Sequence, residues 1–600
     1  MPLFTDYAEI DRHFARFLCR QAGPEDLLLF QAAALASRAV GNGNVCLDLR
    51  EAAVDGVFLD KTWEEVAEHL ARLPVVGRPG DYAPLILDGA GRFYLYRYWR
   101  YEHDLAVNLL DKAGSRAAVD RELLKAGAGR LFPARDGEEV DWQKVAAVAA
   151  ATGRLTVISG GPGTGKTTTV IRILALLVEQ SGGTVPRIAL AAPTGKAAAR
   201  LRESIRSARE GIDCSEAVRS AIPGEASTLH RLLGSVRGTG RFRHNRDNPL
   251  PHDVVVVDEA SMIDLPLMAK LAEALGRHAR LILLGDRDQL ASVEAGKVLG
   301  DIGDTGRSHA YSTGFVNLAA EVAGARLAGT AGEPSPLADC LVVLKKNYRF
   351  GAASPIGRAV RLVNGGEGEA AFRELRDAEG EALTWRTVPV PAGLGKALAD
   401  IIVTGYEAMV HAGTPREALA CYDRFRVLCA VRRGPYGVEG INALAGEILA
   451  GRRLIDGRSR WYRGRPILVT VNDYGRNLFN GDTGIIFPDP ADGELRAFFP
   501  AEGGEVRAVA LTRLPEHETA YAMTVHKSQG SEFSRVLLLL PPGDGELMTR
   551  ELIYTGMTRA RDGVEVWGEE GGFVRAVARK IQRRSGLRER LWGAEAVDAG

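Results

Sequence analysis

Cysteine is scarce in this sequence, and its spacing excludes two kinds of structural scaffold. The 600 residues contain six cysteines, and none of them belongs to a C-x-x-C pair. Zinc sites and disulfide frameworks both depend on suitably spaced cysteines, so neither is predicted. Scattered cysteines are typical of reduced, cytoplasmic proteins, and we expect this protein in the cytoplasm. The cysteines are Cys19, Cys46, Cys214, Cys340, Cys421 and Cys429.

An excess of either charge is also absent. Lysine and arginine together number 76, as do aspartate and glutamate. A protein that coats nucleic acid is strongly basic, so any nucleic-acid contact must be local here. No apolar run approaches the roughly 18 residues that a membrane span needs. Residues 1–17 carry Asp6, Glu9, Asp11 and Arg12, which is not the pattern of a signal peptide. We therefore expect a soluble protein.

What the sequence does contain is a glycine-rich loop in the setting of a nucleotide site. Residues 160–167 match the P-loop pattern G-x-x-x-x-G-K-[ST] at every fixed position. The apolar run 155–158 precedes the loop, and apolar residues at helical spacing follow from 170 to 177. In such a loop backbone N–H groups point at phosphates, Lys166 reaches the β- and γ-phosphates, and the Thr167 hydroxyl ligates Mg²⁺. The sequence predicts that this protein binds a nucleoside triphosphate.

Two further segments combine an apolar strand with polar residues at its end. Residues 254–257 are four consecutive valines, a run that suits a central parallel strand, and Asp258 and Glu259 follow at once. Asp258 is expected to hold Mg²⁺ through water, and Glu259 to orient and deprotonate the attacking water. Gln289 follows the apolar run 281–284, where it would lie beside the γ-phosphate. These residues predict an ATPase centre.

The first 110 residues read as a helical module with one short strand candidate at 45–49 and an amphipathic helix at 62–73. Residues 92–101 interleave aromatic side chains with arginines. This pattern has two interpretations, a stacking surface for nucleic acid or an amphipathic strand with its aromatics in the core. Alternation of period two favours the strand.

A second α/β unit is expected from about residue 341. Arg349 would lie on a turn after an apolar strand, and residues 426–431 are a candidate for a parallel strand. Residues 460–512 read as the short strands of a small antiparallel barrel that is inserted into this unit. Two α/β units around one P-loop place the nucleotide in a cleft, where Arg349 and Arg559 would supply charge to the γ-phosphate in the transition state.

Two basic segments have less specific interpretations. Residues 237–248 are punctuated by glycine and fit either a hairpin or a solvated loop about equally well. Residues 575–590 read as a basic helix with a solvated face.

The motifs in their order along the chain resemble those of superfamily 1 helicases. The forms of the segments 525–530 and 141–144 are similar to the RecD family, the alpha subunits of exodeoxyribonuclease V. The resemblance runs from about residue 110 to 570 and is weaker over the N-terminal module. The motifs that carry it are residues 160–167, 192–196, 258–261, 285–290, 347–349, 524–532 and 554–561.

The resemblance implies an α/β fold with two RecA-like P-loop motor domains, a helical N-terminal module and a small SH3-like β-barrel insertion. The expected domains are a partner-binding module at 1–110, a first RecA-like domain at 111–304 with a small insertion at about 220–250, a second RecA-like domain at 305–440 and 515–600, and the SH3-like insertion at 441–514.

The resemblance also implies roles for individual residues. The ATPase centre would consist of Lys166, Thr167, Asp258, Glu259, Gln289, Arg349 and Arg559. Contacts to ATP would come from Gly160, Gly161, Pro162, Gly163, Thr164, Gly165, Lys166, Thr167 and Thr168, with Gln143, Tyr348 and Glu532 near the base and ribose. Thr167 and Asp258 would hold Mg²⁺, and DNA would be contacted by Pro193, Thr194, His230, Thr524, His526 and Lys527.

The function implied by the resemblance is an ATP-dependent 5′→3′ DNA helicase within a RecBCD-type exodeoxyribonuclease V, which unwinds duplex ends for double-strand break repair by recombination. The partners would be DNA and RecB-like and RecC-like subunits. The length fits this subunit form, because longer stand-alone relatives carry extra N-terminal helix-hairpin-helix modules. A stand-alone helicase, a nucleotide-gated binding subunit without motor activity and an RNA helicase are the alternatives.

Overall fold

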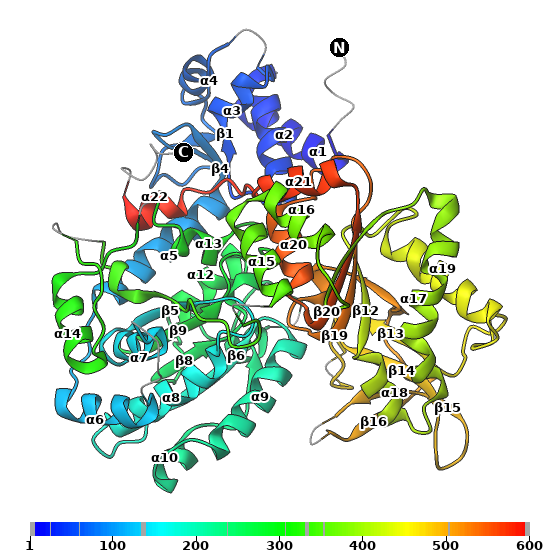
Figure 1. Cartoon of the computed structure of the whole chain (residues 1–600). Coiled ribbons are helices and arrows are strands. Elements are labelled where there is room, and N and C mark those ends of the chain that lie inside the picture. The colour runs from blue at the N-terminus through cyan, green and yellow to red at the C-terminus, as the bar shows by residue number, and fades with distance from the viewer. Residues whose placement is uncertain are drawn as a thin grey trace.

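The computed structural model describes residues 7–23, 26–58, 61–133, 140–236, 238–306, 308–330, 335–351, 354–473, 475–501 and 504–593. Four sheets organise this part of the chain, and Figure 1 shows them as separate regions of the molecule. Of the helices that lie in these ranges, none combines the length and the apolar character needed to cross a bilayer.

The N-terminal module is helical, as expected, and also contains a small sheet whose first strand confirms the candidate at 45–49. Its small sheet has the order β1-β4-β3-β2 and packs with helices whose apolar sides share one core. The predicted amphipathic helix is confirmed as α4, which begins after Thr62 because the Thr62 hydroxyl accepts a bond from the Glu65 N–H. The elements are α1 (Glu9–Ala22), α2 (Leu27–Gly41), β1 (Leu47–Asp48), α3 (Leu49–Val54), α4 (Trp63–Leu70), β2 (Val76–Gly77), β3 (Leu85–Leu87) and β4 (Arg92–Leu95).

The aromatic and arginine-rich segment is a strand only at its start. Strand β4 ends at Leu95, and helix α5 (Tyr96–Gly114) begins at the next residue, so the predicted strand to residue 101 is wrong. Trp99, Glu102, Leu105 and Leu109 are buried on one side of α5, at the steps of three and four residues that a helix produces. The expectation that aromatics of this segment belong to a core is met by Phe93, Tyr94 and Trp99, which are all buried.

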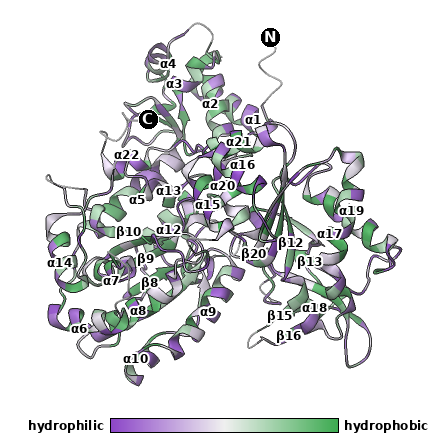
Figure 2. Cartoon of the chain, in the orientation of Figure 1, coloured by the Kyte–Doolittle hydropathy of each residue, from purple (hydrophilic) through white to green (hydrophobic). Residues whose placement is uncertain are grey.

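The first motor sheet is wholly parallel, with the order β10-β5-β9-β8-β6-β7. Strand β8 lies inside it and all four of its valines are buried, which explains the apolar run. Figure 2 shows these strands as hydrophobic, whereas α9 and α10 carry hydrophilic and hydrophobic residues in turn. The strands are β5 (Leu155–Ser159), β6 (Ile188–Ala192), β7 (Ser227–Thr228), β8 (Val254–Val257), β9 (Arg280–Gly285) and β10 (Leu341–Val343).

Helices cover both faces of the first motor sheet. The helical spacing predicted after the P-loop is confirmed as α8 (Lys166–Glu179), and α7 (Trp142–Thr152) precedes the strand that leads into the loop. The others are α6 (Arg121–Leu131), α9 (Gly195–Glu210), α10 (Glu216–Ala221), α11 (Leu229–Leu233), α12 (Leu265–Ala274), α13 (Val298–Gly303) and α14 (Thr313–Ala323). Because β10 pairs with β5, the chain still belongs to this sheet at Val343, beyond the boundary expected at residue 304.

The second motor sheet is also parallel and has the order β11-β20-β19-β12-β18. The strand expected at 426–431 is confirmed as β12. The strands are β11 (Leu383–Thr387), β12 (Phe425–Cys429), β18 (Ala522–Thr524), β19 (Phe533–Leu539) and β20 (Ala560–Gly568), and the helices are α15 (Pro355–Gly365), α16 (Gly368–Arg376), α17 (Pro391–His411), α18 (Pro415–Tyr422), α20 (Arg550–Met557) and α21 (Glu570–Ala578).

An antiparallel sheet is inserted between β12 and β18, as expected. It follows α19 (Val438–Gly451) and has the order β16-β15-β14-β13-β17 around a small apolar core that includes Ile467, Ile486 and Phe499. Its strands are β13 (Arg465–Val469), β14 (Thr483–Pro488), β15 (Leu495–Pro500), β16 (Val506–Ala510) and β17 (His517–Thr519). The last strand lies beyond residue 514, the end of the insertion expected from the sequence; its likeness to an SH3 barrel stays a prediction.

The two basic segments, 237–248 and 575–590, differ in how they compare with the sequence predictions. Arg237 lies outside the described residues, and 238–248 form turns with one bridge, between Ser235 and Phe242, in place of a regular hairpin. The single helix expected at 575–590 is wrong, because α21 ends at Ala578 and a separate helix, α22 (Leu587–Trp592), follows.

The segment 579–592, which we call the C-terminal strap, lies against the N-terminal module and the first motor sheet (Figure 1). Arg583 donates to Gly43 O at 2.7 Å and to Ser292 O at 3.0 Å. The buried Glu102 carboxylate accepts from Gly586 N at 2.8 Å and Arg590 Nε at 2.9 Å. The strap is therefore a packed part of the fold.

Candidate active site

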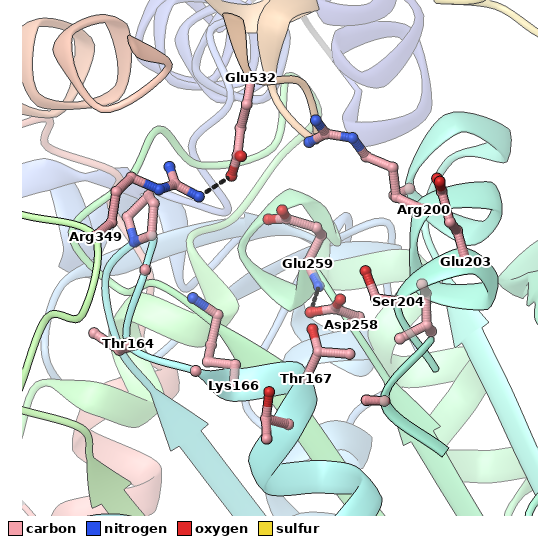
Figure 3. Close-up of a pocket in the computed structure, with 18 of the residues that line it drawn as sticks. Thr164, Lys166, Thr167, Arg200, Glu203, Ser204, Asp258, Glu259, Arg349 and Glu532 are labelled. Atoms are coloured by element: carbon pink, nitrogen blue, oxygen red, sulfur yellow. Dashed lines mark hydrogen bonds and ion pairs between the residues drawn. The ribbon is translucent and has the colours of Figure 1, made fainter. Parts of the chain in front are cut away.

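A polar cavity of ≈ 650 Å³ lies where the P-loop meets the second motor sheet, and Figure 3 shows residues that line it. Its walls come from the P-loop, from the segment after β8, from α9 and from loops next to β19 and β20. All residues predicted for the ATPase centre line this cavity, namely Lys166, Thr167, Asp258, Glu259, Gln289, Arg349 and Arg559.

The P-loop has the backbone conformation that its glycines permit. Gly163 and Gly165 have φ values of 83° and 78°, in the left-handed region, and α8 begins directly after Gly165. A Cβ atom on Gly163 would lie 2.5 Å from the Arg349 Cβ, so a larger residue does not fit. The Lys166 ammonium donates to Gly160 O at 2.5 Å and to Gly161 O at 3.2 Å, which holds it at the mouth of the loop.

Two predicted nucleotide contacts, Gln143 and Tyr348, donate hydrogen bonds to carbonyl oxygens of the P-loop. Gln143 Nε2 donates to Thr164 O at 3.1 Å, and its side chain is buried. Tyr348 N donates to Gly163 O at 2.8 Å, while its ring is 44% exposed. Gly160, Gly161, Gln143 and Tyr348 do not line the cavity, whereas Pro162, Gly163, Thr164, Gly165, Thr168 and Glu532 do.

The carboxylates after β8 are held in a tight turn. Glu259 has a φ of 52°, rare for a residue with a side chain, and its N–H donates to Asp258 Oδ1 at 2.8 Å. Burial and the charge of Glu259 together raise the pKa of Asp258 to about 6, against the opposing charge of Lys166. Figure 3 shows the Thr167 hydroxyl next to Asp258. A hydroxyl and a carboxylate are oxygen ligands that suit Mg²⁺ together with phosphate oxygens.

The loop after β9 connects the two motor sheets. The buried carboxylate of Asp286 accepts from Gln289 Nε2 at 3.0 Å and from the Tyr554 hydroxyl at 2.9 Å. Leu290 N donates to Thr555 Oγ1 at 3.0 Å. Because Tyr554 and Thr555 belong to α20, a change at Gln289 can reach the second motor sheet.

The predicted arginines are held in different ways. Arg349 Nη2 lies 2.5 Å from Glu532 Oε1, and Arg561 Nε lies 3.2 Å from Glu532 Oε2. Burial acts to raise the pKa of Glu532, but the charges of Arg349 and Arg200 outweigh it and hold that pKa at about 2. Arg559 is 2% exposed and donates to Thr555 O at 3.1 Å and Ser531 O at 3.3 Å.

Two buried polar atoms of the cavity residues have no hydrogen-bond partner within the described ranges. They are Arg349 Nη1, a donor, and Gln289 Oε1, an acceptor. Buried polar groups normally have partners, so these atoms point to a bound ligand. A phosphate oxygen satisfies the donor and a water molecule satisfies the acceptor, which fits ATP and the water that attacks it.

The predicted DNA contacts form two groups, one on each motor sheet. Pro193 and Thr194 follow β6, and His230 lies in α11, after the neighbouring strand β7. Thr524 is the last residue of β18, and His526 and Lys527 follow that strand. The Thr194 hydroxyl accepts from Ala197 N and caps α9, and Lys527 Nζ lies 2.9 Å from Glu518 Oε1. Their contact with DNA stays a prediction.

The residues that sequence reasoning did not assign to the site include Arg200, Arg561 and Tyr554. Arg200 lies on α9 and lines the cavity. The Tyr554 hydroxyl bonds to Asp286, and a Cβ atom on Gly161 would lie 2.7 Å from it. A helix capped by Thr194 would have indicated Arg200, because residues 197, 200 and 204 then lie along one side. No local signal indicates the pairing of Tyr554 with Asp286.

Family models match three parts of the chain. The model described as RecBCD enzyme subunit RecD, N-terminal domain, matches residues 7–94. The AAA domain model matches residues 143–295, and the UvrD-like helicase C-terminal domain model matches residues 519–566. The last two ranges contain the P-loop and the segment 524–532.

Curated relatives match over most of the chain. The RecBCD enzyme subunit RecD of Mycobacterium tuberculosis is 42% identical over 97% of this chain and 94% of its own length. The ATP-dependent RecD2 DNA helicase of Deinococcus radiodurans is 31% identical over 88% of this chain and 62% of its own length. A Pif1 helicase from Bacteroides, solved with ADP-AlF3 and ssDNA, is 16% identical with a TM-score of 0.36 and covers 71% of this chain and 91% of its own, a likeness too low to support an argument.

The two kinds of match agree along the chain. The N-terminal module matches a domain model specific to one family, and the M. tuberculosis relative extends the same match through both motor sheets at 42% identity. The chain belongs to the RecD family.

Proposed function

We propose that this chain is an ATP-dependent DNA helicase that moves 5′→3′ and acts in the cytoplasm as a subunit of a RecBCD-type exodeoxyribonuclease V. Its task would be to unwind duplex ends for double-strand break repair by recombination. The observation that carries the proposal is the cavity itself, which the P-loop lines on one side and arginines next to the second motor sheet line on the other. Closure of the cavity on ATP would move one sheet relative to the other.

The residues divide the work of ATP hydrolysis among them. Lys166 binds the β- and γ-phosphates, and Thr167 and Asp258 hold Mg²⁺, which supplies charge that stabilises the phosphates. Glu259 accepts the proton of the attacking water, and Gln289 orients that water. Arg349 and Arg559 neutralise the charge that develops on the γ-phosphate, once they have left the partners described above.

Coupling to DNA would pass through the loop after β9. Gln289 shares the Asp286 carboxylate with Tyr554, so loss of the γ-phosphate can change the position of α20. The groups around Thr194 and Lys527 would bind successive parts of a single strand, one group on each motor sheet. Motion between the sheets then becomes motion along DNA.

The N-terminal module would dock on RecB-like and RecC-like subunits. The family model for the RecD N-terminal domain covers residues 7–94, which supports this role. A stand-alone RecD-like helicase is the second candidate, and the likeness to the Deinococcus RecD2 helicase favours it. That relative is matched over 62% of its length, against 94% for the M. tuberculosis subunit, so the subunit form is the better supported.

Purification of the native protein from its own cells tests both candidates. We expect it to elute with two larger partners, and the isolated chain to show ATPase activity that single-stranded DNA stimulates more than RNA does. Partial duplexes with a 5′ tail should be unwound and those with a 3′ tail should not. Lys166→Ala is the matched control, because it removes the phosphate contact and leaves the core intact. An ATPase that ignores DNA, or that survives Lys166→Ala with the fold confirmed by circular dichroism, would refute the proposal.

A further inference from the structure

One side of helix α9 forms a wall of the nucleotide cavity. The helix belongs to the first motor sheet and begins after Thr194, whose hydroxyl caps it. Its cavity-lining residues recur one turn apart and are Ala197, Arg200, Leu201, Glu203, Ser204, Ser207 and Ala208. Most of them are small or apolar, and Arg200 is the only cation among them. This arrangement gives the first motor sheet an arginine of its own in the cavity.

Arg200 is distinguished from the other arginines of the cavity by what it contacts. Arg349 and Arg561 share the Glu532 carboxylate, and Arg559 bonds to main-chain carbonyls. Within the described part of the chain, the Arg200 guanidinium has no hydrogen bond or ion pair. Figure 3 shows its side chain extending from α9 into the cavity, towards Glu532 and above Glu259.

The electrostatics of the cavity leave this cation without a full counter-charge. Burial lowers the pKa of Arg200, and Glu532 opposes that effect. A guanidinium nevertheless stays ionised in proteins, so the cost of burying it is offset only by an anion. The lining cations are Lys166, Arg200, Arg349, Arg559 and Arg561, and the lining acids are Glu203, Asp258, Glu259 and Glu532. The cations exceed the acids, as expected for a site that receives a more negative ligand.

We propose that Arg200 contacts the γ-phosphate of ATP from the side opposite the P-loop. The proposal rests on the function proposed above and adds a phosphate contact to it. Arg200 lies over Glu259, the residue assigned to the attacking water, and therefore at the γ end of the phosphate chain. Arg200 lies on α9 and Lys166 on α8, and both helices belong to the unit built around the first motor sheet. The contact of Arg200 with the phosphate can therefore form before the two motor sheets close. Arg349 and Arg559 must first leave their present partners. Arg200 therefore lets the open protein distinguish ATP from ADP.

Nucleotide titrations without DNA test this assignment. The probes are a fluorescent ADP and a fluorescent, non-hydrolysable ATP analogue, both with Mg²⁺. For Arg200→Ala we expect affinity for the ATP analogue to fall about tenfold or more, the effect of a lost charge-assisted contact, and affinity for ADP to change less than about twofold. Arg200→Lys keeps the charge without the planar fork and should give an intermediate loss. Arg202→Ala is the matched control, since Arg202 lies on the same helix and faces Glu225 at 3.7 Å, and neither affinity should change.

Two results would overturn the assignment. One is equal loss of ADP and ATP-analogue affinity, which means that Arg200 shapes the site as a whole. The other is an unchanged affinity for both, which means that it touches neither. Arg200→Gln keeps the length of the side chain and gives the same comparison if the alanine variant is unstable by circular dichroism. The titrations use no DNA, so failure of the helicase assignment would appear separately, as wild-type ATPase activity that DNA does not stimulate.

Discussion

Arg349 Nη2 lies 2.5 Å from Glu532 Oε1, and this ion pair joins residues 183 positions apart in the chain. Arg561 occupies the other oxygen of the same carboxylate. Arg559, the second arginine assigned to the γ-phosphate, is instead held by the carbonyls of Thr555 and Ser531. Substitution of Arg349 and substitution of Arg559 should therefore slow ATP hydrolysis to a similar extent. The two substitutions should change the thermal stability of the protein by different amounts.

Arg349→Ala should slow ATP hydrolysis by about 10³ or more, as expected for a lost arginine finger. The thermal unfolding midpoint should change little, because the pair with Glu532 is about one-fifth exposed on each side and Glu532 keeps Arg561. Steady-state ATPase rates and differential scanning calorimetry check both parts. An ATP hydrolysis rate close to that of the wild-type protein would show that Arg349 is not a catalytic residue.

Arg559→Ala should leave nucleotide affinity near wild type and also slow hydrolysis by about 10³ or more. It should lower the thermal midpoint as well, because two buried carbonyls lose a charged donor, a loss of roughly 1–3 kcal/mol. Nucleotide titration, turnover and calorimetry on one preparation separate these effects. A parallel fall of ATP affinity and turnover would show a ground-state contact and contradict the cross-cleft assignment.

Asp301→Asn should stabilise the protein increasingly as the pH rises from 5 to 8. Burial and, to a smaller extent, the charge of Glu102 raise the pKa of Asp301 to about 8. The folded form therefore holds a proton that the unfolded form has lost above about pH 4. The stability that this proton contributes is fully present below the pKa of Asp301 in the unfolded chain. It declines by up to about 1.4 kcal/mol per pH unit as the pH rises towards the pKa of Asp301 in the folded protein. Asparagine removes this dependence.

Calorimetry of wild type and Asp301→Asn at several pH values measures the difference. The gap in thermal midpoint should be small at pH 5 and largest near pH 8. Asp304→Asn is the control, because Asp304 follows α13 and its carboxylate is 60% exposed. A constant gap over this range would mean that Asp301 is ionised in the folded protein.

Arg583→Ala should loosen the attachment of the C-terminal strap to the N-terminal module. Arg583 donates to Gly43 O and Ser292 O, and the adjacent Arg584 O accepts from Val45 N at 2.7 Å. Without Arg583, hydrogen exchange at the Val45 amide should accelerate, because that bond depends on the strap. Mass spectrometry of exchange measures this, with Arg575→Ala as control, since Arg575 pairs with Asp544 away from the module. Equal exchange in both variants would show that Arg583 does not hold the strap.

The isolated chain should not cut DNA, although the complex that we propose does. Nucleases of recombination complexes place an acid two residues before a catalytic lysine, and no lysine of this sequence has Asp or Glu there. Among the described residues, no group of three or more His, Cys, Asp or Glu side chains could hold a metal. End-labelled linear DNA with Mg²⁺ should show ATP consumption and no scission. Cleavage by the chain alone, lost on substitution outside the ATP site, would contradict this.

The sequence by itself determined the chemistry that depends on neighbouring residues. The P-loop, the Asp258–Glu259 pair and Gln289 each lie within a few residues of the end of an apolar run, so a strand and the group that follows it are specified together. The parallel character of both motor sheets followed from such runs. The helices of the N-terminal module and its strand at 45–49 were predicted, whereas a strand as short as Val76–Gly77 has too few residues for a period to be recognised.

Only the tertiary structure decided which distant segments meet. Strand β10 joins the first motor sheet beside β5, Glu532 joins Arg349 and Arg561, and Arg200 enters the cavity from α9. The C-terminal strap is likewise a basic stretch by composition and a buried link by position. These contacts depend on strand order and on how helices pack across a sheet. Periodicity reports which face of an element is buried, and it contains no information about which other element will cover that face.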